Sequence, residues 1–431
     1  MRPVREAWED YRGALASFTR PARLFLLTEG LAWVCHGVFA VLFNLYLLEA
    51  GYRESFVGRA ISLNGLGLAL AALPAGILAD RWGRRRCLVL GAALDATAQL
   101  TRATFLAPGA VLAGSFVSGV GQALLAIAAA PFLTEHSAPR ERTHLFSTFF
   151  ATTLLAAVAG SVLGGELPAL LGHLPEALRP DRLHSYRVAL WVGGLINLAA
   201  CTPLMRLRGM TEPVLSHARI AADAAARRRL VPIGLNALLI GAGAGLVIPF
   251  MNLYFARRFS CSSSQIGVFF SLAAVFTALA SLLGPALARR FGMLRTAVAA
   301  QLLSLPFLVT LGAEQNLGIA VVAFWMRASL MQASTPLVQA FVMEALPTSL
   351  RARSTSLITL VWNCGWAVSA TLSGVIIQKL GYDVPFYITA GLYAAAATIF
   401  FTAFRHTREA APGPRLPEEA EGRHGEGPLT E

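Results

Sequence analysis

The chain has 431 residues, of which 55% are hydrophobic and 14% are charged, and its mean hydropathy is +0.58. Soluble globular chains carry about 25% charged residues, so much of this chain is expected to be solvated by lipid, and a disordered, coiled-coil, collagen-like or disulfide-stabilised scaffold is excluded for the whole. The 36 basic and 24 acidic residues leave a net charge of +12, which fits a nucleic-acid partner or a membrane surface until the charges are located.

The first 22 residues are charged and precede a first apolar run at 24–48. Within them, apolar side chains recur at the spacing of one helix face, at Val4, Trp8, Tyr11, Leu15 and Phe18. We expect an amphipathic helix on the membrane surface, with a docking helix for a partner as the alternative. The run at 24–48 is too long for the apolar core of a signal peptide, so it is predicted to remain as a spanning helix.

Twelve runs are apolar over about 20 residues, the length needed to cross a membrane. They form two blocks of six, near 24–48, 56–78, 87–106, 109–132, 145–167, 187–207, 230–256, 265–288, 294–313, 318–343, 354–378 and 384–404. The predicted fold is an all-α membrane protein. Its predicted parts are a cytoplasmic segment at 1–22, a six-helix bundle at 23–207, a cytoplasmic linker at 208–229, a second six-helix bundle at 230–405 and a disordered cytoplasmic tail at 406–431.

Arginine placement sets the predicted orientation. Basic residues concentrate in the central linker and in the connections after spans 2, 4, 8 and 10, at Arg81, Arg84, Arg85, Arg86, Arg140, Arg142, Arg206, Arg208, Arg227, Arg228, Arg229, Arg289, Arg290, Arg295, Arg351 and Arg353. By the positive-inside rule, the linker and both termini are predicted to be cytoplasmic, in the plasma (cell inner) membrane. The excess charge then orients the chain in membrane lipid and requires no nucleic-acid partner.

The two blocks of spans share one register of matching residues. Asn44-Leu45-Tyr46 recurs 208 positions later as Asn252-Leu253-Tyr254. After a one-residue slip the matches continue at an offset of 209, in pairs that include Gly58 with Gly267, Ser62 with Ser271, Glu135 with Glu344 and Gly165 with Gly374. The chain is therefore interpreted as two copies of a six-helix unit. Secondary transporters with such halves bind substrate near the midplane and rock the halves around it.

The connection after the second span carries the most specific motif, Gly76-Ile-Leu-Ala-Asp80-Arg81-Trp-Gly83-Arg84-Arg85-Arg86. It resembles the signature between helices 2 and 3 of the major facilitator superfamily, and together with the repeat the resemblance covers 23–405. It implies twelve transmembrane helices and transport by alternating access. Gly76 is expected to allow close helix contact and Gly83 a tight turn.

The resemblance also implies a cytoplasmic gate, whose predicted members are Gly76, Asp80, Arg81, Gly83, Arg84, Arg85 and Glu135. Asp80 is expected to stabilise arginines of its loop and the N-terminal dipole of helix 11, near 351–354. Glu135 is expected to pair with Arg84 or another arginine of the loop. These contacts would form when the transporter faces outward and break when it opens inward. The second copy has Arg289 in place of Asp80, so the two halves are predicted to be unequal switches.

In the superfamily, helices 1, 4, 7 and 10 line the cavity. Burying an ionisable side chain within a span costs free energy, so such residues are candidates for a function. Glu29, Trp33, His36 and Asn44 share one face of the first span. Glu29 is either a proton site or an interfacial acid that reaches cytoplasmic water. His36 titrates in the physiological range when hydrated, and is either a proton carrier or a hydrogen-bonded packing residue.

Arg327 lies deep in the tenth span and is predicted to bind an anionic substrate group or a carboxylate partner in the cavity. The alternative is a structural ion pair with an acid on another helix. Other candidates for the substrate or proton cavity are Gln122, Asn236, Gln332, Trp362, Asn363 and Trp366, each of which can instead serve helix packing. On the third span, the stripe of Asp95, Gln99 and Arg102 is expected to satisfy itself against a neighbouring helix, because helix 3 is peripheral in the superfamily.

The predicted function is secondary active transport of a small organic solute, with proton-coupled export of an amphiphile preferred. One alternative is a carrier of an anionic metabolite that uses Arg327. Another, from a different class, is a non-transporting receptor or scaffold on the same fold, which predicts a collapsed cavity. The arginine that the superfamily's drug–proton antiporters carry in helix 4 is missing from 111–132, which weakens drug–proton antiport.

An enzyme is not predicted, because the chain lacks the HExxH, GxSxG and phosphate-loop motifs. No cofactor or metal is expected, since the five cysteines contain no CxxC pair and are interpreted as small buried hydrophobic residues. The expected partners are a small-molecule substrate, membrane lipid and protons as the coupling ion, and the expected state is a monomer.

Overall fold

The computed structural model of the chain describes residues 18–138, 141–206, 224–345 and 348–405, and the regular structure within these residues is helical throughout. Most of the predicted amphipathic segment and the predicted tail lie outside them. The predicted linker lies outside them as far as 223, but α9 begins at Ala224. The last part of that linker is thus helical, and it starts in an alanine-rich run that favours helix.

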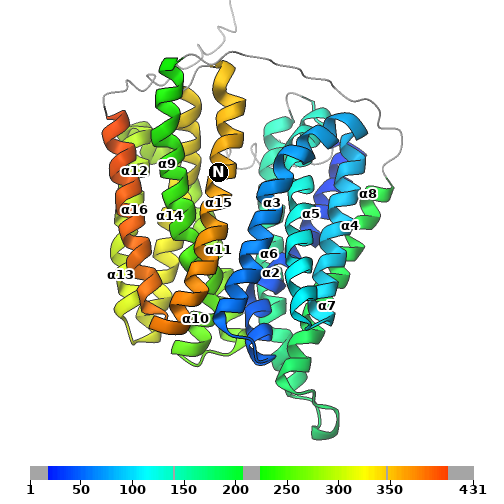
Figure 1. Cartoon of the computed structure of the whole chain (residues 1–431). Coiled ribbons are helices and arrows are strands. Elements are labelled where there is room, and N and C mark those ends of the chain that lie inside the picture. Colours follow the sequence, from blue (N-terminus) through cyan, green and yellow to red (C-terminus); the bar gives the residue numbers. More distant parts are fainter. Residues whose placement is uncertain (1–17, 139–140, 207–223, 346–347, 406–431) are drawn as a thin grey trace, which may run out of the picture.

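The N-terminal half consists of six spans (Figure 1). Its helices are α2 Arg20–Glu49, α3 Glu54–Trp82, α4 Arg84–Thr104, α5 Pro108–Glu135, α6 Arg142–Gly172, the short η1 Glu176–Leu178, α7 Arg182–Ala199 and α8 Cys201–Met205. Thr19 caps α2, because its side chain accepts a hydrogen bond from the Ala22 amide. α7 and α8 together form one span that is interrupted at Ala200.

The C-terminal half repeats this pattern. Its helices are α9 Ala224–Val247, η2 Ile248–Phe250, α10 Met251–Arg258, α11 Ser263–Phe291, α12 Met293–Leu303, α13 Leu305–Ala313, α14 Leu317–Ala345, α15 Thr348–Leu380 and α16 Asp383–Phe404. Two spans are broken at prolines, which cannot donate a backbone hydrogen bond: Pro249 in η2 and Pro306 at the start of α13.

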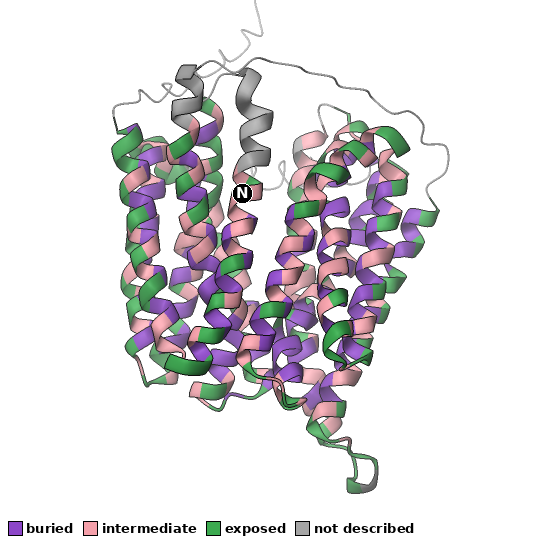
Figure 2. Cartoon of the chain, in the orientation of Figure 1, coloured by how far each residue is buried: buried purple, intermediate pink, exposed green. Residues whose placement is uncertain are grey.

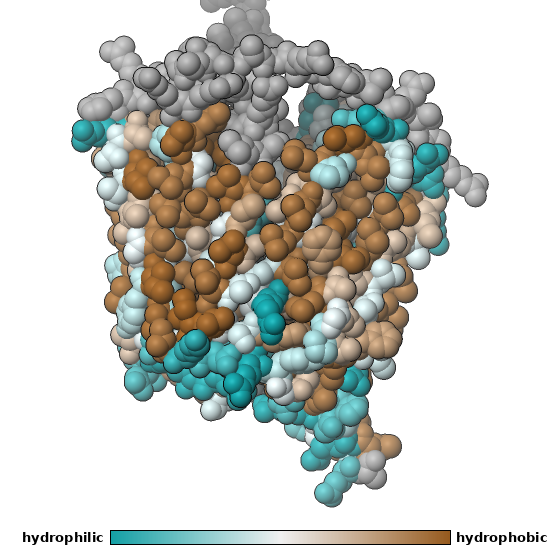
Figure 3. Space-filling view, in the orientation of Figure 1, coloured by the Kyte–Doolittle hydropathy of each residue, from teal (hydrophilic) through white to brown (hydrophobic). Residues whose placement is uncertain are grey.

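Eleven of the described helical segments are long and apolar enough to cross a membrane. The twelfth predicted span is α4, which carries Asp95, Gln99 and Arg102, all of them buried. α4 packs against α5 and α7, so its polar side chains face protein and not lipid. Figure 3 shows apolar residues covering the middle of the visible face, with hydrophilic residues gathered toward its lower end. The fold is the predicted all-α membrane bundle of two related halves.

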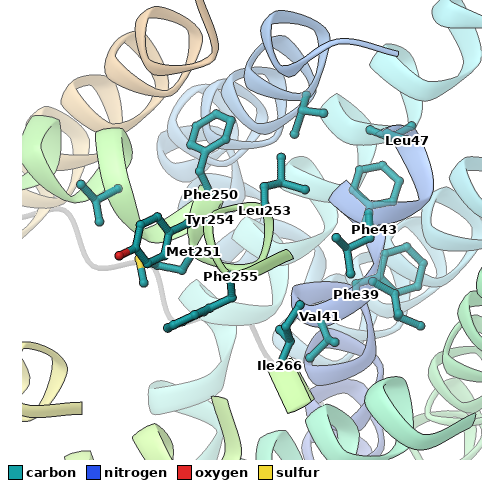
Figure 4. Packing of buried hydrophobic residues seen from close by; sticks show 14 of the residues in the cluster. Phe39, Val41, Phe43, Leu47, Phe250, Met251, Leu253, Tyr254, Phe255 and Ile266 are labelled. Atoms are coloured by element: carbon teal, nitrogen blue, oxygen red, sulfur yellow. The ribbon is translucent and has the colours of Figure 1, made fainter. Parts of the chain in front are cut away.

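The two halves meet at one end of the bundle. We call this the closed end, where α2 ends and α3 begins, and we call the opposite end the linker end, where α8 ends and α9 begins. A buried apolar cluster joins the halves toward the closed end; Figure 4 shows its side chains from α2 and from η2–α10, among them Phe39, Phe43, Phe250 and Leu253. Buried residues occur along both halves (Figure 2), but of the three buried clusters among the described residues this one alone contains residues of both halves. The core therefore holds the halves together from the closed end.

Candidate functional site

The internal repeat is visible in the contacts at the closed end. The Asn44 side-chain amide of α2 donates to the Pro249 carbonyl oxygen at 2.6 Å and to Asn252 Oδ1 at 3.0 Å. In return, Asn252 Nδ2 donates to the carbonyl oxygens of Ala40 at 3.1 Å and Val41 at 3.0 Å. Asn44 is therefore a contact between the halves, and not the cavity residue that the sequence predicts.

Two close helix crossings repeat the same symmetry. A Cβ atom on Gly58 of α3 would lie 2.5 Å from the Ala370 carbonyl oxygen of α15, and one on Gly267 of α11 would lie 2.5 Å from the Ser161 carbonyl oxygen of α6. Beside each crossing, a serine one turn further on donates to the facing helix. The hydrogen bonds between the halves, among the described residues, all lie between the midplane and the closed end.

The predicted gate motif forms the turn between α3 and α4 at the linker end. Gly83 alone connects the two helices and has a φ of +88°, which favours glycine, and Gly292 repeats this turn with a φ of +86°. Arg81 lies in the last turn of α3 and has an exposed side chain. Gly76 departs from the prediction: a Cβ atom there would meet nothing within 4 Å, because α3 makes its close crossings near the other end.

The charged residues of the motif contact their own half. Arg84 forms the predicted ion pair with Glu135 of α5. Arg85 Nη2 donates to the Met205 carbonyl oxygen at 3.2 Å, at the end of α8. Asp80 lies close enough to Arg84 to act on its charge, and none of the described contacts joins Asp80 to α15. The latch between Asp80 and helix 11 stays a prediction.

A cavity of about 840 Å³ lies in the C-terminal half. Small-molecule sites have volumes of about 300–1,000 Å³. α9, α14 and α15 form most of its wall, and its described lining residues include neither aspartate nor glutamate. Five of the predicted cavity residues line it: Asn236, Arg327, Gln332, Trp362 and Trp366.

Arg327 is the one charged residue among the described residues of this wall. Its side chain is 4% exposed, and its Nε and Nη1 atoms make no hydrogen bond within the described chain. The Tyr393 hydroxyl is its side-chain hydrogen-bond partner. Burying a guanidinium whose donors are unpaired costs desolvation free energy. An anion that accepts hydrogen bonds from those donors offsets that free energy. The wall of the cavity therefore carries an anion-binding group.

The apolar part of the wall is aromatic. The rings of Trp362 and Trp366 stack with centroids 5.2 Å apart and planes inclined by 27°. Asn236 is buried and donates to a backbone carbonyl oxygen of α16 at 3.1 Å. Asn363, also predicted here, lies outside the lining, and its side-chain amide donates to a backbone carbonyl oxygen one turn earlier in α15.

Two cavity residues are absent from the prediction. Gln301 of α12 lines the cavity, and its buried Oε1 atom has no hydrogen-bond donor among the described residues. Tyr393 of α16 joins the wall beside Arg327. A lone amide within the apolar run 294–313 is a signal that could have identified Gln301. In sequence, Tyr393 looks like any packing aromatic residue.

The N-terminal half holds a buried polar cluster at its centre. Asp95 of α4 is fully buried; its Oδ1 accepts from Ser118 Oγ at 2.6 Å and from Gln122 Nε2 at 3.4 Å. Its Oδ2 accepts from Asn197 Nδ2 at 2.8 Å and lies 3.6 Å from His36 Nε2. The predicted cavity residues Gln122 and His36 thus belong to a network that joins α2, α4, α5 and α7.

Arg102 and Glu29 extend this cluster. Arg102 donates to Gln99 Oε1 and to two serines of α5, and its guanidinium lies over the rings of Phe39 and Phe43 at 5.4 and 4.7 Å. Glu29 is 8% exposed, hydrogen-bonds the Trp33 side chain and lies in the field of Asp95. The polar stripe on α4 forms hydrogen bonds with α5 and α7, as the sequence predicts, and among its described atoms only Arg102 Nε lacks a partner.

Comparison with known proteins identifies the fold. The sequence profile of the Major Facilitator Superfamily matches residues 25–232 and again residues 233–429, which is one match for each half. The chain belongs to the major facilitator superfamily. A solved structure of a bacterial homolog of the human lysosomal transporter Spinster, in an inward-facing and occupied conformation, has a TM-score of 0.73 at 16% identity, covering 89% of this chain and 96% of that one.

Two relatives match parts of the sequence. The multidrug resistance protein MdtL of Klebsiella pneumoniae (strain 342) is 31% identical over 116 residues, which are 27% of this chain and 30% of that protein. The 3-(3-hydroxy-phenyl)propionate transporter of Escherichia coli (strain K12) is 28% identical over 192 residues, 42% of this chain and 43% of that protein. Each match spans less than half of the relative.

As a member of this superfamily, the chain is an integral, multi-pass membrane protein. Its family and relatives are transporters and not enzymes.

Proposed function

We propose that this transporter carries an amphiphilic organic anion, which Arg327 binds in the cavity of the C-terminal half. The observation that supports this proposal is the buried Arg327 guanidinium, with two unpaired nitrogens, on a wall without an acidic residue among those described. A structural ion pair, the alternative from the sequence, needs an acid beside it. Among the described residues, none lies within ion-pair distance of Arg327.

The rest of the cavity suits an apolar or aromatic body. Trp362 and Trp366 supply a stacked pair of rings, and Ile240, Met331 and Val338 line the wall around them. Ligand sites are usually of this kind, mostly apolar with a few placed polar groups. An anion with an aromatic or aliphatic body fits both parts of the wall.

The unpaired acceptor of Gln301 favours a substrate that also carries a hydrogen-bond donor. Its buried Oε1 atom gains a partner from a hydroxyl or amide of the substrate. The relative from Escherichia coli is named for 3-(3-hydroxyphenyl)propionate, a compound with a carboxylate, an aromatic ring and a hydroxyl. We therefore propose aromatic carboxylates that also carry a hydroxyl as the preferred substrates.

The geometry of the halves supports alternating access as the mechanism. The described contacts between the halves lie toward the closed end, so rocking about the midplane would separate them there and bring the linker ends together. We propose that the linker end faces the cytoplasm, as the arginine distribution predicts, and that the conformation described here faces inward. Asp80 would then reach the start of α15 only in the outward-facing state.

The direction of transport and the coupling ion stay predictions. The likeness to MdtL, a multidrug resistance protein, supports export of an amphiphile. A non-transporting scaffold predicts a collapsed cavity, whereas the cavity here has a volume of about 840 Å³. The monomeric state and the plasma membrane location are likewise predictions.

The test is binding and uptake of a matched pair of compounds that differ only in charge. We expect purified protein to bind 3-phenylpropionate and not 3-phenylpropionamide, and proteoliposomes to accumulate the labelled acid. Arg327→Gln should abolish the preference for the acid. Arg290→Gln, which removes an exposed arginine of the same half at the linker end, is the matched control and should keep it.

Equal binding of acid and amide by the wild type would refute the proposal, as would acid binding that Arg327→Gln leaves unchanged. Saturable binding without uptake would favour the receptor or scaffold alternative.

A further inference from the structure

His36 has one nitrogen whose protonation state the backbone fixes. Its Nδ1 lies 2.8 Å from the Ala32 carbonyl oxygen, one turn earlier in α2. A carbonyl oxygen only accepts hydrogen bonds, so Nδ1 carries a hydrogen. In a neutral imidazole the other nitrogen, Nε2, then has no hydrogen and presents a lone pair.

That lone pair faces a carboxylate. Nε2 lies 3.6 Å from Asp95 Oδ2, and Asp95 is fully buried. Two acceptors facing each other in a buried site repel, whereas a proton on Nε2 turns the contact into an ion pair. The geometry of the pair therefore requires one proton between the imidazole and the carboxylate.

The surroundings of Asp95 decide which group holds that proton. Ser118 and Asn197 donate to its two oxygens at 2.6 and 2.8 Å, and two glutamine amides approach Oδ1 at 3.4 Å. Donors of this kind stabilise the ionised carboxylate. These hydrogen bonds stabilise the ionised form of Asp95, so the exchangeable proton belongs on His36.

Four other charged or titratable groups are described around His36. Glu29 lies on the same face of α2, Cys35 is its buried neighbour in sequence, and Asp95 and Arg102 face it from α4. Arg102 reaches Asp95 through Ser118 and Gln99 and makes no ion pair with it among the described residues. Of these groups, Asp95 is the acid within ion-pair distance of the His36 imidazole.

We infer that His36 and Asp95 form a proton-binding site in the N-terminal half, in which the imidazole takes up the proton and the carboxylate stays charged. The site lies in the half opposite the Arg327 cavity. α2 carries both His36 and, two turns further on, Asn44, whose amide bonds Asn252 across the interface. Protonation is therefore placed on the helix that joins the halves, and the proton serves as coupling ion if the transport proposal holds.

Protonation can be measured without any substrate. The Trp33 ring lies 5.6 Å from the His36 ring, and a protonated imidazole quenches indole fluorescence. We expect the fluorescence of the purified full-length chain to change in a step as the pH is varied, and this step to be lost in Trp33→Phe and in His36→Gln. Asp95→Asn should move the midpoint down by about one to three pH units, because an opposite charge favours the protonated form. His184→Gln removes the exposed histidine paired with Asp181 and is the matched control, which should leave the step unchanged.

A second measurement needs no change at Asp95, in case Asp95→Asn fails to fold. Nitrogen NMR of histidine-labelled protein, assigned by His36→Gln, should show neutral His36 with its hydrogen on Nδ1 at high pH. A neutral His36 protonated on Nε2, or a midpoint that Asp95→Asn leaves in place, would overturn the proton site.

Coupling is tested separately from substrate binding. In proteoliposomes, His36→Gln should abolish accumulation of the labelled acid driven by a pH gradient and retain exchange of labelled for unlabelled acid without a gradient. Gradient-driven accumulation in His36→Gln would overturn the coupling role. Loss of exchange in the wild type would instead refute the transport proposal and leave the fluorescence result standing.

Discussion

The two halves are copies of one repeat, but corresponding positions have different roles in them. In the register of the repeat, Glu29 and His36 of the N-terminal half correspond to Ala237 and Ala244 of the C-terminal half. The acid and the histidine belong to the buried polar cluster, whereas both alanines line the cavity. Small side chains at these two positions leave open the volume that the larger polar ones fill.

The difference continues on the fourth helix of each half. Ser118 corresponds to Arg327, and Gln122 corresponds to Met331. Ser118 and Gln122 satisfy Asp95, while Arg327 faces a cavity with two unpaired nitrogens. Among the described buried side-chain atoms, Arg102 Nε lacks a hydrogen-bond partner at the centre of the N-terminal half, whereas three atoms lack one around the cavity of the other half: Arg327 Nε, Arg327 Nη1 and Gln301 Oε1. We interpret the division as one half for the proton and one for the substrate.

The largest effect that this comparison predicts is on the stability of the N-terminal half. Asp95→Leu removes the acceptor of Ser118, Asn197 and Gln122, and with it the carboxylate whose charge acts on Arg102. Breaking a buried charged network costs about 3–5 kcal/mol. In detergent, Asp95→Leu should lower the unfolding temperature strongly. Glu176→Leu, at an exposed position of η1, should leave the unfolding temperature unchanged. Equal unfolding temperatures for the two variants would mean that the cluster contributes nothing.

The second effect lies in the C-terminal half and has a different signature. Arg327→Gln should weaken binding of 3-phenylpropionate by about 10- to 150-fold, since a hydrogen bond to a charged group contributes about 1.5–3 kcal/mol. The stability of the substrate-free protein should fall by less than about 1 kcal/mol, because removal of an unpaired buried charge relieves a cost. Calorimetric titration and thermal unfolding check both parts. A loss of stability as large as that of Asp95→Leu would remove the contrast between the halves.

The third prediction concerns the interface that the halves share. A Cβ atom on Gly374 would lie 2.4 Å from the Glu54 carbonyl oxygen, so Gly374→Ala should force the closed end apart at a cost of about 1–3 kcal/mol. Spin labels on cysteines placed at the exposed positions Arg53 and Lys379 should report a longer distance.

Gly391→Ala is the control for this interface, because a Cβ atom there meets nothing within 4 Å. It should leave the label distance unchanged. An unchanged distance in Gly374→Ala as well would show that the crossing tolerates a methyl group and does not set the conformation.

The smallest effect is expected at the gate motif. Arg84 and Glu135 are partly exposed, and such pairs contribute about 0.2–1 kcal/mol. The corresponding positions of the other half hold Met293 and Glu344, which cannot form this pair. A double-mutant cycle of Arg84→Gln and Glu135→Gln on thermal unfolding measures the coupling. A coupling energy above about 2 kcal/mol would mark the pair as a structural lock in the conformation described here.

Much of the fold was predictable because lipid imposes a strong rule on composition. The twelve apolar runs, the register from Asn44 to Gly374 and the turn at Gly83 all correspond to features of the structure. The polar helix α4 is a span that this rule of composition does not identify. Its composition resembles a surface helix, and only its packing between α5 and α7 explains how it lies within the bundle.

The candidate site was only partly predictable. Arg327 could be identified because a deep arginine in an apolar span is rare, and Arg84 with Glu135 because the motif is specific. Gln301 and Tyr393 were missed, and Asn363 was assigned to a wall that it does not line. Sequence spacing determines which residues share a helix face but not which neighbouring helix covers that face.

The sequence by itself determined that the chain is a multi-pass helical membrane protein, that it is duplicated and to which superfamily it belongs, because these depend on composition and on periodic matches along the chain. The tertiary structure alone decided the partners of the ionisable residues. It brought Asp95 within reach of His36, turned Asn44 toward the opposite half and left Arg327 unpaired beside a cavity. Such pairings depend on distances of a few ångströms between helices far apart in sequence, which neither hydropathy nor spacing encodes.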